Sequence, residues 1–328
     1  MTLWTLAFLT FLAANLGSGV RQRIILLSRL ESRDKLRLVT EAGVQKAVML
    51  LNEDLEQNQF QFSLAAKNFR QNNEMKFKSI ELNGGISEVS YEYTDGPGYP
   101  PVKRYGLQDE ESKINVNTAD ARALKNLFKT VLQWDDSHSQ ELADNIIEWR
   151  EPDGTQLKGF YSQDYYENLS DPYSAKKAKF ELLDELLLIK NVDLKVLQTL
   201  RNYLTVYGDS RVNINTASRP VLVALGLTEE VADKILSVRR GKDGIDGTLD
   251  DHVFLKSYDV ASEVKKSIEM NNSETAQIDQ LNAGQKIDTN SYYYSVAVYG
   301  RLQNFQSRES ILCVMNAKDS KIEYWREE

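Results

Sequence analysis

The first twenty residues carry no charged side chain, and no proline interrupts the next thirty. The run 3–20 is apolar apart from a few small polar residues, and its length is close to the roughly 20 residues that cross a bilayer as a helix. From Arg21 to Asp54 only Gly43 interrupts good helix formers. The sequence therefore predicts one helix from about residue 3 to about residue 56, about 80 Å long at 1.5 Å per residue. Its first part would lie in lipid and its second part on a globular head. The apolar side chains expected to face lipid or partner helices are Leu3, Trp4, Leu6, Phe8, Leu9, Phe11, Leu12 and Leu16.

A basic segment follows the apolar run. Residues 21–46 hold seven basic and three acidic side chains, whereas the whole chain has a net charge of −8. An uncharged N-terminal segment (1–20), a basic segment (21–46, called the basic collar below) and an acidic remainder (called the body) follow one another in the chain. This order is typical of a membrane-anchored protein. A cleaved secretory signal is a competing interpretation, but no basic residue precedes the run. The positive-inside rule alone would place the collar and the body in the cytoplasm. A basic leader upstream of Met1, missing from this sequence because the reading frame was started too late, would remove that conflict.

Composition argues against several classes of function. A net charge of −8 does not suit a protein that mainly grips nucleic-acid phosphates. A single cysteine, Cys313, excludes an internal disulfide framework. Two histidines give little material for a zinc site or a Ser-His-Asp triad. Adjacent acids such as Asp135 and Asp136 are expected at the surface of an acidic protein, so we predict no enzymatic activity.

Strand patterns lie at both ends of the region beyond the long helix. Residues 75–82 and 86–93 read as two strands around an Asn-Gly-Gly turn. Residues 292–302, 307–315 and 321–325 read as further antiparallel strands, while residues 108–286 between them read as helical. Because the flanking strands need each other to bury a face, we predict an α+β fold: a long N-terminal helix packed on an antiparallel sheet, with a large helical insert.

The insert contains an internal repeat. The segment Ile114-Asn-Val-Asn-Thr-Ala recurs as Val212-Asn-Ile-Asn-Thr-Ala, and residues 141–150 are echoed by residues 230–239. Thr118 and Thr216 are the expected N-caps of the helices that follow. The repeat predicts two small helical modules, each burying one apolar stripe.

Each module resembles the helix-hairpin-helix or SAM-like fold, which raises the alternative of a membrane-anchored DNA-binding protein. In DNA-binding versions a glycine-containing hairpin offers backbone N–H groups to a phosphate. Here the second module has Glu229 and Glu230 beside its glycine, and the first module has no glycine in its hairpin. Carboxylates would repel a phosphate. The favoured interpretation is therefore a scaffold for protein contacts, with no nucleic acid bound.

A glycine-bearing loop, residues 242–251, concentrates acidic side chains and is called the acidic loop below. Calcium prefers six to eight oxygen ligands, and glycines let a short loop wrap it. The spacing does not match an EF-hand, and a solvated turn with Asx caps is the alternative. We predict calcium ligands at Asp243, Asp246, Asp250 and Asp251, and a weaker second site that includes Asp153 and Asp164.

Four stretches lie in order along nearly the whole chain: Leu3 to Phe8, Tyr105 to Ala119, Asp164 to Leu186 and Leu204 to Ala217. Together they resemble the K-type minor pseudopilins of the type II secretion system (general secretion pathway protein K). Tyr105 to Ala119 resembles the start of that family's helical insert, and Asp164 to Leu186 resembles the linker between its two modules. Leu204 to Ala217 is similar to the start of its second module, and Leu3 to Phe8 to the middle of its signal helix. The family's basic leader and cleavage glycine are not seen in this sequence.

The resemblance implies a pilin-like fold and a role in assembly. The chain would have a transmembrane part (1–20), a pilin-like helix with first strands (21–107), the helical insert (108–286, with modules at 108–200 and 205–286) and C-terminal strands of the pilin sheet (287–328). It would be a single-pass protein of the bacterial inner membrane with its globular part in the periplasm, capping the tip of the pseudopilus. Its implied partners are the I- and J-type minor pseudopilins and the inner-membrane platform, with secreted substrates as further candidates. Its implied cofactor is calcium, held in the helical insert.

Overall fold

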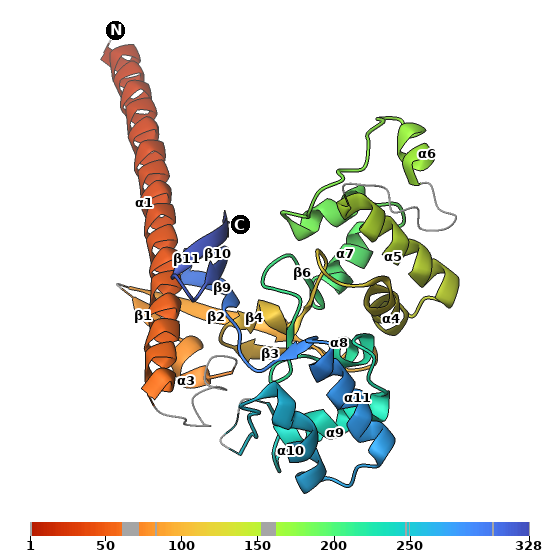
Figure 1. Cartoon of the computed structure of the whole chain (residues 1–328). Helices are drawn as coiled ribbons and strands as arrows, with labels where there is room; N and C mark the ends of the chain where they lie inside the picture. The colour runs from red at the N-terminus through yellow and green to blue at the C-terminus, as the bar shows by residue number, and fades with distance from the viewer. Residues whose placement is uncertain are drawn as a thin grey trace.

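The computed structural model describes residues 2–60, 72–82, 84–151, 162–246, 248, 250–303 and 305–327. Figure 1 shows three parts: a long projecting helix, a β-sheet that packs against its C-terminal half, and a helical insert on the far side of the sheet. The structure therefore has the predicted α+β architecture.

Helix α1 (Thr2–Phe60) spans 59 residues without a break. Its N-terminal half projects from the body, and its side chains become buried only from Leu36 onward. The buried positions beyond that point recur every three or four residues, as expected for one face of a helix: Leu36, Val39, Thr40, Val44, Ala47, Leu50 and Leu51.

Two glycines let α1 lie close to the sheet. A Cβ atom at Gly43 would be 2.7 Å from both Ser87 Cβ and Val298 Cγ1, which is closer than real Cβ contacts. Gly300 on the sheet likewise faces the side chain of Thr40, with no space for a Cβ. The glycine that weakens the helical pattern at position 43 is thus explained by the close approach of helix and sheet.

The main sheet joins strands from both ends of the chain. Its order is β1 (Ile80–Leu82), β2 (Gly85–Tyr93), β9 (Tyr293–Leu302), β10 (Phe305–Asn316) and β11 (Lys321–Glu327). Strand β3 (Val102–Tyr105) pairs with β2, β4 (Gln108–Asp109) pairs with β9, and all these pairs are antiparallel. Strands β2 and β9 meet with Val89 opposite Val298. The first part of the predicted strand 75–82 is instead a short helix, α3 (Glu74–Phe77), capped by Asn73.

The insert begins after β4 with the 3₁₀ turn η2 (Glu110–Ser112) and consists of two successive modules. The first contains β5 (Ile114–Asn115), α4 (Ala121–Leu132), α5 (Asp136–Arg150), α6 (Ser162–Glu167), η3 (Leu183–Leu188), α7 (Leu194–Leu200) and β6 (Leu204–Thr205). The second contains β7 (Val212–Asn213), α8 (Arg219–Ala224), α9 (Glu229–Arg239), η4 (Ser257–Asp259), α10 (Val260–Ser267), α11 (Asn272–Ala283) and β8 (Ile287–Asp288). A two-stranded parallel pair closes each module, β5 with β6 and β7 with β8. The buried apolar residues of both modules nevertheless form one continuous cluster.

The repeated motif has the same geometry in both modules. Asn117 bonds both backbone groups of Phe180, at 2.8 and 3.0 Å, and Asn215 does the same with Phe254, at 2.8 and 2.9 Å. The arginine that ends the second helix donates to two carbonyls of the motif: Arg150 to Val116 and Ala119, and Arg239 to Ile214 and Ala217.

The predicted N-caps are wrong by two residues. Asp120 caps α4 by accepting from the Ala123 N–H at 2.7 Å, and Ser218 occupies the cap position of α8. The Thr118 hydroxyl instead lies 3.5 Å from the Asn115 carbonyl oxygen, and Thr216 donates to Asp109 at 2.6 Å. The preceding asparagines already close the turn through their own side chains, so each helix starts two residues later than predicted.

Candidate functional site

Three carboxylates of the acidic loop converge at the surface of the second module. The loop follows α9 and turns at Gly241, whose φ of 62° favours glycine. Among the described residues, Asp243, Asp250 and Asp251 each offer an oxygen within 4.8 Å of the other two. Asp243 and Asp250 are exposed, whereas Asp251 is mostly buried.

Hydrogen bonds within the loop hold these carboxylates in place. Asp250 Oδ2 accepts from the N–H of Lys242 at 2.6 Å and of Asp243 at 3.2 Å. The Thr248 hydroxyl lies 2.8 Å from Asp250 Oδ1 and 3.2 Å from Asp251 Oδ1. The hydrogen bonds from Thr248 and from the Lys242 amide lower the pKa of Asp250. These hydrogen bonds already shape the loop around Asp250.

The donor set fits a hard divalent cation. Three carboxylates in a glycine-turned loop are the ligands that calcium prefers, and the rest of its six to eight oxygens would come from carbonyls and water. Asp243 also accepts from the Ile245 N–H at 2.8 Å, which is the Asx turn of the alternative interpretation. Both interpretations are compatible with the same loop, so calcium at this site stays a prediction.

The prediction that Asp246 belongs with the other three is wrong. Its side chain points inward, is 5% exposed, and accepts from Arg104 at 2.7 Å, Arg239 at 3.0 Å and Arg240 at 3.1 Å. Burial alone would raise the pKa of Asp246, but the attraction of the three guanidinium groups holds it well below its usual range. The decisive partner, Arg104, lies on strand β3 of the sheet and is 142 positions away in sequence, so spacing within the loop gave no sign of it.

The second predicted calcium site cannot be placed. Asp153 lies outside the described residues, and Asp164 lies in α6, where the structure describes the backbone but not this side chain. Of the neighbouring acids, Glu148 lies 3.6 Å from the Lys177 ammonium. This second site stays a prediction.

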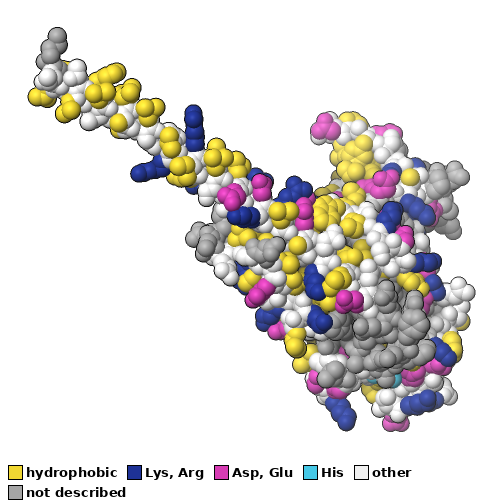
Figure 2. Space-filling model, turned by 90° about the vertical axis from the view of Figure 1, so that its left-hand side faces the viewer, with side chains coloured by type: hydrophobic (Ala, Val, Ile, Leu, Met, Phe, Trp, Pro, Cys, Tyr) yellow, Lys and Arg dark blue, Asp and Glu magenta, His cyan; other side chains and the backbone are white. Residues whose placement is uncertain are grey.

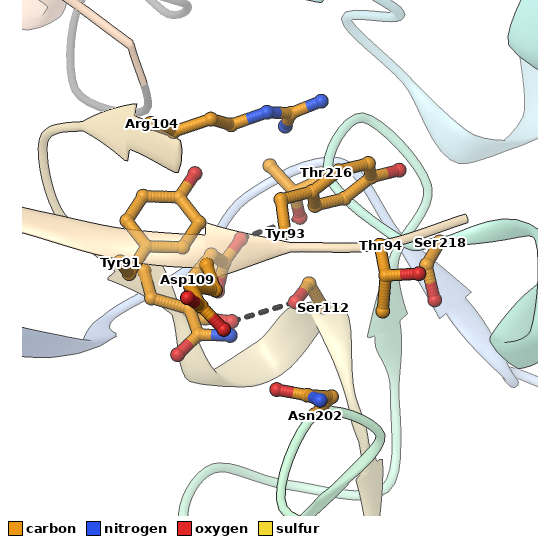
Figure 3. A pocket seen from close by; sticks show the side chains of 11 residues that line it. Tyr91, Tyr93, Thr94, Arg104, Asp109, Ser112, Asn202, Thr216 and Ser218 are labelled. Carbon is orange, nitrogen blue, oxygen red and sulfur yellow. Dashed lines mark hydrogen bonds between the residues drawn. The ribbon is translucent and has the colours of Figure 1, made fainter. Parts of the chain in front are cut away.

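Sequence reasoning missed a buried acidic triplet where the insert joins the sheet. The side chains of Asp109, Glu110 and Glu111 are all buried. Asp109 Oδ2 accepts from Asn213 at 2.9 Å, from Thr216 at 2.6 Å and from Ser291 at 2.6 Å. Figure 3 shows Asp109 between Thr216 and Ser112, with Tyr91 beside it. The carboxylate thus links the start of the insert to the second module and to the segment that leads back into β9.

The other two acids of the triplet complete the same junction. Glu111 Oε2 accepts from the backbone N–H of Tyr292 at 2.5 Å and of Tyr293 at 3.3 Å. Glu110 pairs with Lys113 at 2.7 Å and accepts from Thr205 at 2.6 Å. Burial raises the pKa of Glu111 to about 7. For Glu110, burial acts in the same direction, but Lys113 brings its pKa below the usual value. Three consecutive acidic residues are usually expected at the surface of a protein. The sequence therefore contains no pattern that would predict this buried junction.

A small polar cavity lies beside Asp109, lined from the sheet by residues such as Tyr93 and Arg104 and from the two modules by Asn202 and Ser218. Its volume is about 20 Å³, whereas pockets for small-molecule ligands measure roughly 300–1,000 Å³. The cavity is therefore part of the joint between sheet and insert.

The apolar residues predicted to face lipid or partner helices are all exposed on the projecting part of α1. Trp4 is 83% exposed and Leu12 is 45% exposed. A window of 18 residues within Thr2–Glu53 has a mean hydropathy of 1.5 and none of it is buried, so by length and composition this helix can cross a membrane. Figure 2 shows hydrophobic side chains along the projecting end and basic side chains where the helix approaches the body.

Comparison with known proteins gives a family match and a structural match. Residues 105–209 match the family described as type II secretion system (T2SS), protein K. The structure is similar to a chain in the crystal structure of the GspK–GspI–GspJ complex from the type 2 secretion system of enterotoxigenic Escherichia coli, with a TM-score of 0.60 and 12% sequence identity. That alignment covers 92% of this chain and 99% of the other. A comparison with curated proteins found no match.

The family match and the structural match agree, and they cover different lengths of the chain. The family match covers the first half of the insert, including the first copy of the repeated motif, whereas the structural match extends the shared fold to α1 and the sheet. Residues 105–209 thus match the protein K family of type II secretion systems, and the chain as a whole shares its fold with a chain of the GspK–GspI–GspJ complex.

Proposed function

We propose that the chain is anchored by the apolar part of α1 in the bacterial inner membrane, with sheet and insert in the periplasm, and that it caps the tip of the pseudopilus. The observation that carries this proposal is the position of the insert. Figure 1 places α1 on one side of the sheet and the insert on the other. In a filament whose subunits pack through their long helices, an insert of this size beside the sheet would obstruct the position at which a further subunit must bind. The role is one of binding and assembly, without chemistry.

The expected partners are the I- and J-type minor pseudopilins and the inner-membrane platform, with secreted substrates as further candidates. The fold is shared with a chain of a complex that contains GspK, GspI and GspJ. In addition, residues 2–30 of α1 are almost wholly exposed, which leaves this stretch available to lipid and to partner helices.

DNA binding is disfavoured by the geometry of the second module. Helix α9 begins at Glu229, and this side chain pairs with Arg219 at 3.0 Å. A phosphate at this helix start would meet Glu229 and Glu230, and the nearby cation is already engaged.

The junction suggests a direct test of the capping role. Asp109 and Ser291 lie 2.6 Å apart by their side-chain oxygens, so residues 112–290 can be replaced by a short glycine linker without stretching the sheet. The full chain should be found only at filament ends by immunogold labelling, together with the I- and J-type proteins. The variant without the insert should lose this restriction and label filaments along their length. Uniform labelling by the full chain would refute the capping role.

We further propose that Asp243, Asp250 and Asp251 hold a calcium ion in the insert. When bound, the ion would neutralise three converging carboxylates and cross-link the two ends of the acidic loop. The test is thermal unfolding of the full chain in calcium and in chelator. Calcium at 100 times its dissociation constant should stabilise the protein by about 2.7 kcal/mol. The double substitution Asp250→Asn and Asp251→Asn should abolish this, whereas Asp279→Asn, an exposed acid on α11, should not. An unchanged calcium effect in the double variant would refute the site.

A further inference from the structure

The acidic loop has an outer face and an inner face. On the outer face, Asp243, Asp250 and Asp251 converge toward solvent; on the inner face, Asp246 is buried against the sheet. We propose that the loop couples cation binding to the seating of the helical insert on the pilin sheet, with Asp246 and Arg104 as the positioning residues. This inference rests on the calcium site proposed above.

Asp246 is a direct bridge between the two parts. Its Oδ2 lies 2.7 Å from an amino group of Arg104 on strand β3, and its Oδ1 lies 3.0 Å from Nε of Arg239 at the end of α9. Arg240, also at the end of α9, reaches Asp246 at 3.1 Å and Asp95, in the loop after β2, at 2.6 Å. One carboxylate therefore joins strand β3 to helix α9.

The ion pairs of Asp246 require its carboxylate to be accurately placed, because all three side chains are shielded from water. Asp246, Arg104 and Arg239 are 5%, 7% and 2% exposed. The Arg104 guanidinium also stacks on the ring of Tyr93, 3.4 Å from its centroid. Withdrawing the carboxylate would leave three guanidinium groups close together with little water to screen them, which is strongly unfavourable. The backbone at Asp246 must therefore be held in position for sheet and insert to stay together.

The outer carboxylates control that position. Asp243 precedes Asp246 by three residues and Asp250 follows it by four, so the two lie at the two ends of the segment that carries the bridge. Asp250 already accepts from the Asp243 N–H at 3.2 Å. The like charges of the outer face repel one another, which works against the hydrogen bonds that hold the carboxylates together. A cation that contacts Asp243 and Asp250 removes this repulsion and so favours the placement of Asp246 against Arg104.

The experiment measures hydrogen exchange of the full chain in detergent, in calcium chloride and in chelator. In the wild type, calcium should slow exchange in the acidic loop and also in strand β3, by about tenfold at both places. Asp246→Asn should keep the slowing in the loop but reduce it at β3 to less than about twofold. Arg104→Gln removes the same bridge from the sheet side and should give the same result, which covers the case that Asp246→Asn does not fold.

Lys103→Gln is the matched control, because Lys103 lies next to Arg104 on β3 but pairs with Glu88 instead. It should keep the calcium effect at both places. If calcium changes nothing in the loop of the wild type, both the calcium site and the coupling fail. If calcium protects the loop but not β3, or still protects β3 in both Asp246→Asn and Arg104→Gln, the calcium site survives and the coupling is overturned.

Discussion

Asn117 and Asn215 show how one side-chain type fixes the same turn twice. Each amide accepts from and donates to the backbone of a phenylalanine that is distant in sequence, Phe180 or Phe254. An asparagine side chain carries an acceptor and donors, so it can bond both the N–H and the C=O of one residue, as a neighbouring strand would. This explains why the repeat keeps its second asparagine while the surrounding apolar residues vary between the two copies.

Replacing these asparagines by alanine should destabilise the insert unequally. Asn215 is buried and also donates to the Thr289 carbonyl at 3.1 Å, whereas Asn117 is half-buried and makes fewer backbone contacts. We expect Asn215→Ala to lower the free energy of unfolding by about 2–4 kcal/mol and Asn117→Ala by about 1–2 kcal/mol, because buried backbone groups lose their partners. Urea unfolding monitored by circular dichroism checks the order. Equal losses would contradict the assigned roles.

Glu111 should make stability depend on pH. Burial raises its pKa from 4.5 to about 7 in the folded chain, so the folded state binds more protons than the unfolded state between these values. Stability should therefore fall as pH rises from about 4.5 to about 7, and the loss should be complete above that range. Glu111→Gln keeps an acceptor for the amides of Tyr292 and Tyr293 but cannot titrate.

The measurement is the free energy of unfolding in urea at pH 5 and pH 8. The difference between the two values should be smaller in Glu111→Gln than in the wild type. Glu81→Gln, an exposed position on β1, should retain the wild-type difference. If Glu111→Gln shows the wild-type pH dependence, the ionisation of this side chain is not coupled to folding.

Among the elements, α1 illustrates a competition between helix propensity and packing. Alanine at position 43 would favour the helix by about 1 kcal/mol, but its Cβ would collide with Ser87 and Val298. We expect Gly43→Ala to destabilise the protein by about 1–3 kcal/mol net, because a well-packed contact does not accept added volume. Gly19→Ala, where nothing lies within 4 Å, should leave the unfolding of the head unchanged. Thermal unfolding of both variants checks this, and a stabilised Gly43→Ala would contradict the close contact of α1 and sheet.

Periodic elements could be predicted from the sequence, and contacts between distant residues could not. The long helix, the strands around residues 86–93 and 292–315, and the repeated motif each have a local pattern that matches their structure. Asp246 and Glu111 have no such pattern, because their environment depends on Arg104 and on Tyr292, which are far away in sequence. Asp243, Asp250 and Asp251 did come together as expected, since a short glycine-bearing loop restricts how far they can separate.

On the scale of the whole molecule, the described residues form two hydrophobic cores. One lies between α1 and the sheet and includes Val44, Val89 and Val298; the other fills the insert from Ile114 to Ile287. The chain passes between them at the junction, where the contacts are polar and include the bonds of Asp109 and Glu111. Apolar burial holds each part together, while hydrogen bonds and ion pairs set how the two parts meet.

The insert alone, residues 111–290, should therefore fold, and it should do so as one unit. Its two modules share one continuous core, so they should unfold in a single cooperative transition. Trp134 and Trp149 report on the first module by fluorescence, and hydrogen exchange of α9 and α11 reports on the second. Both probes should give the same urea midpoint, below that of the insert in the full chain because the bonds to Asp109 and Arg104 are lost. Two separate midpoints would show that the modules are independent domains, and an unfolded fragment would show that the insert depends on the sheet for its core.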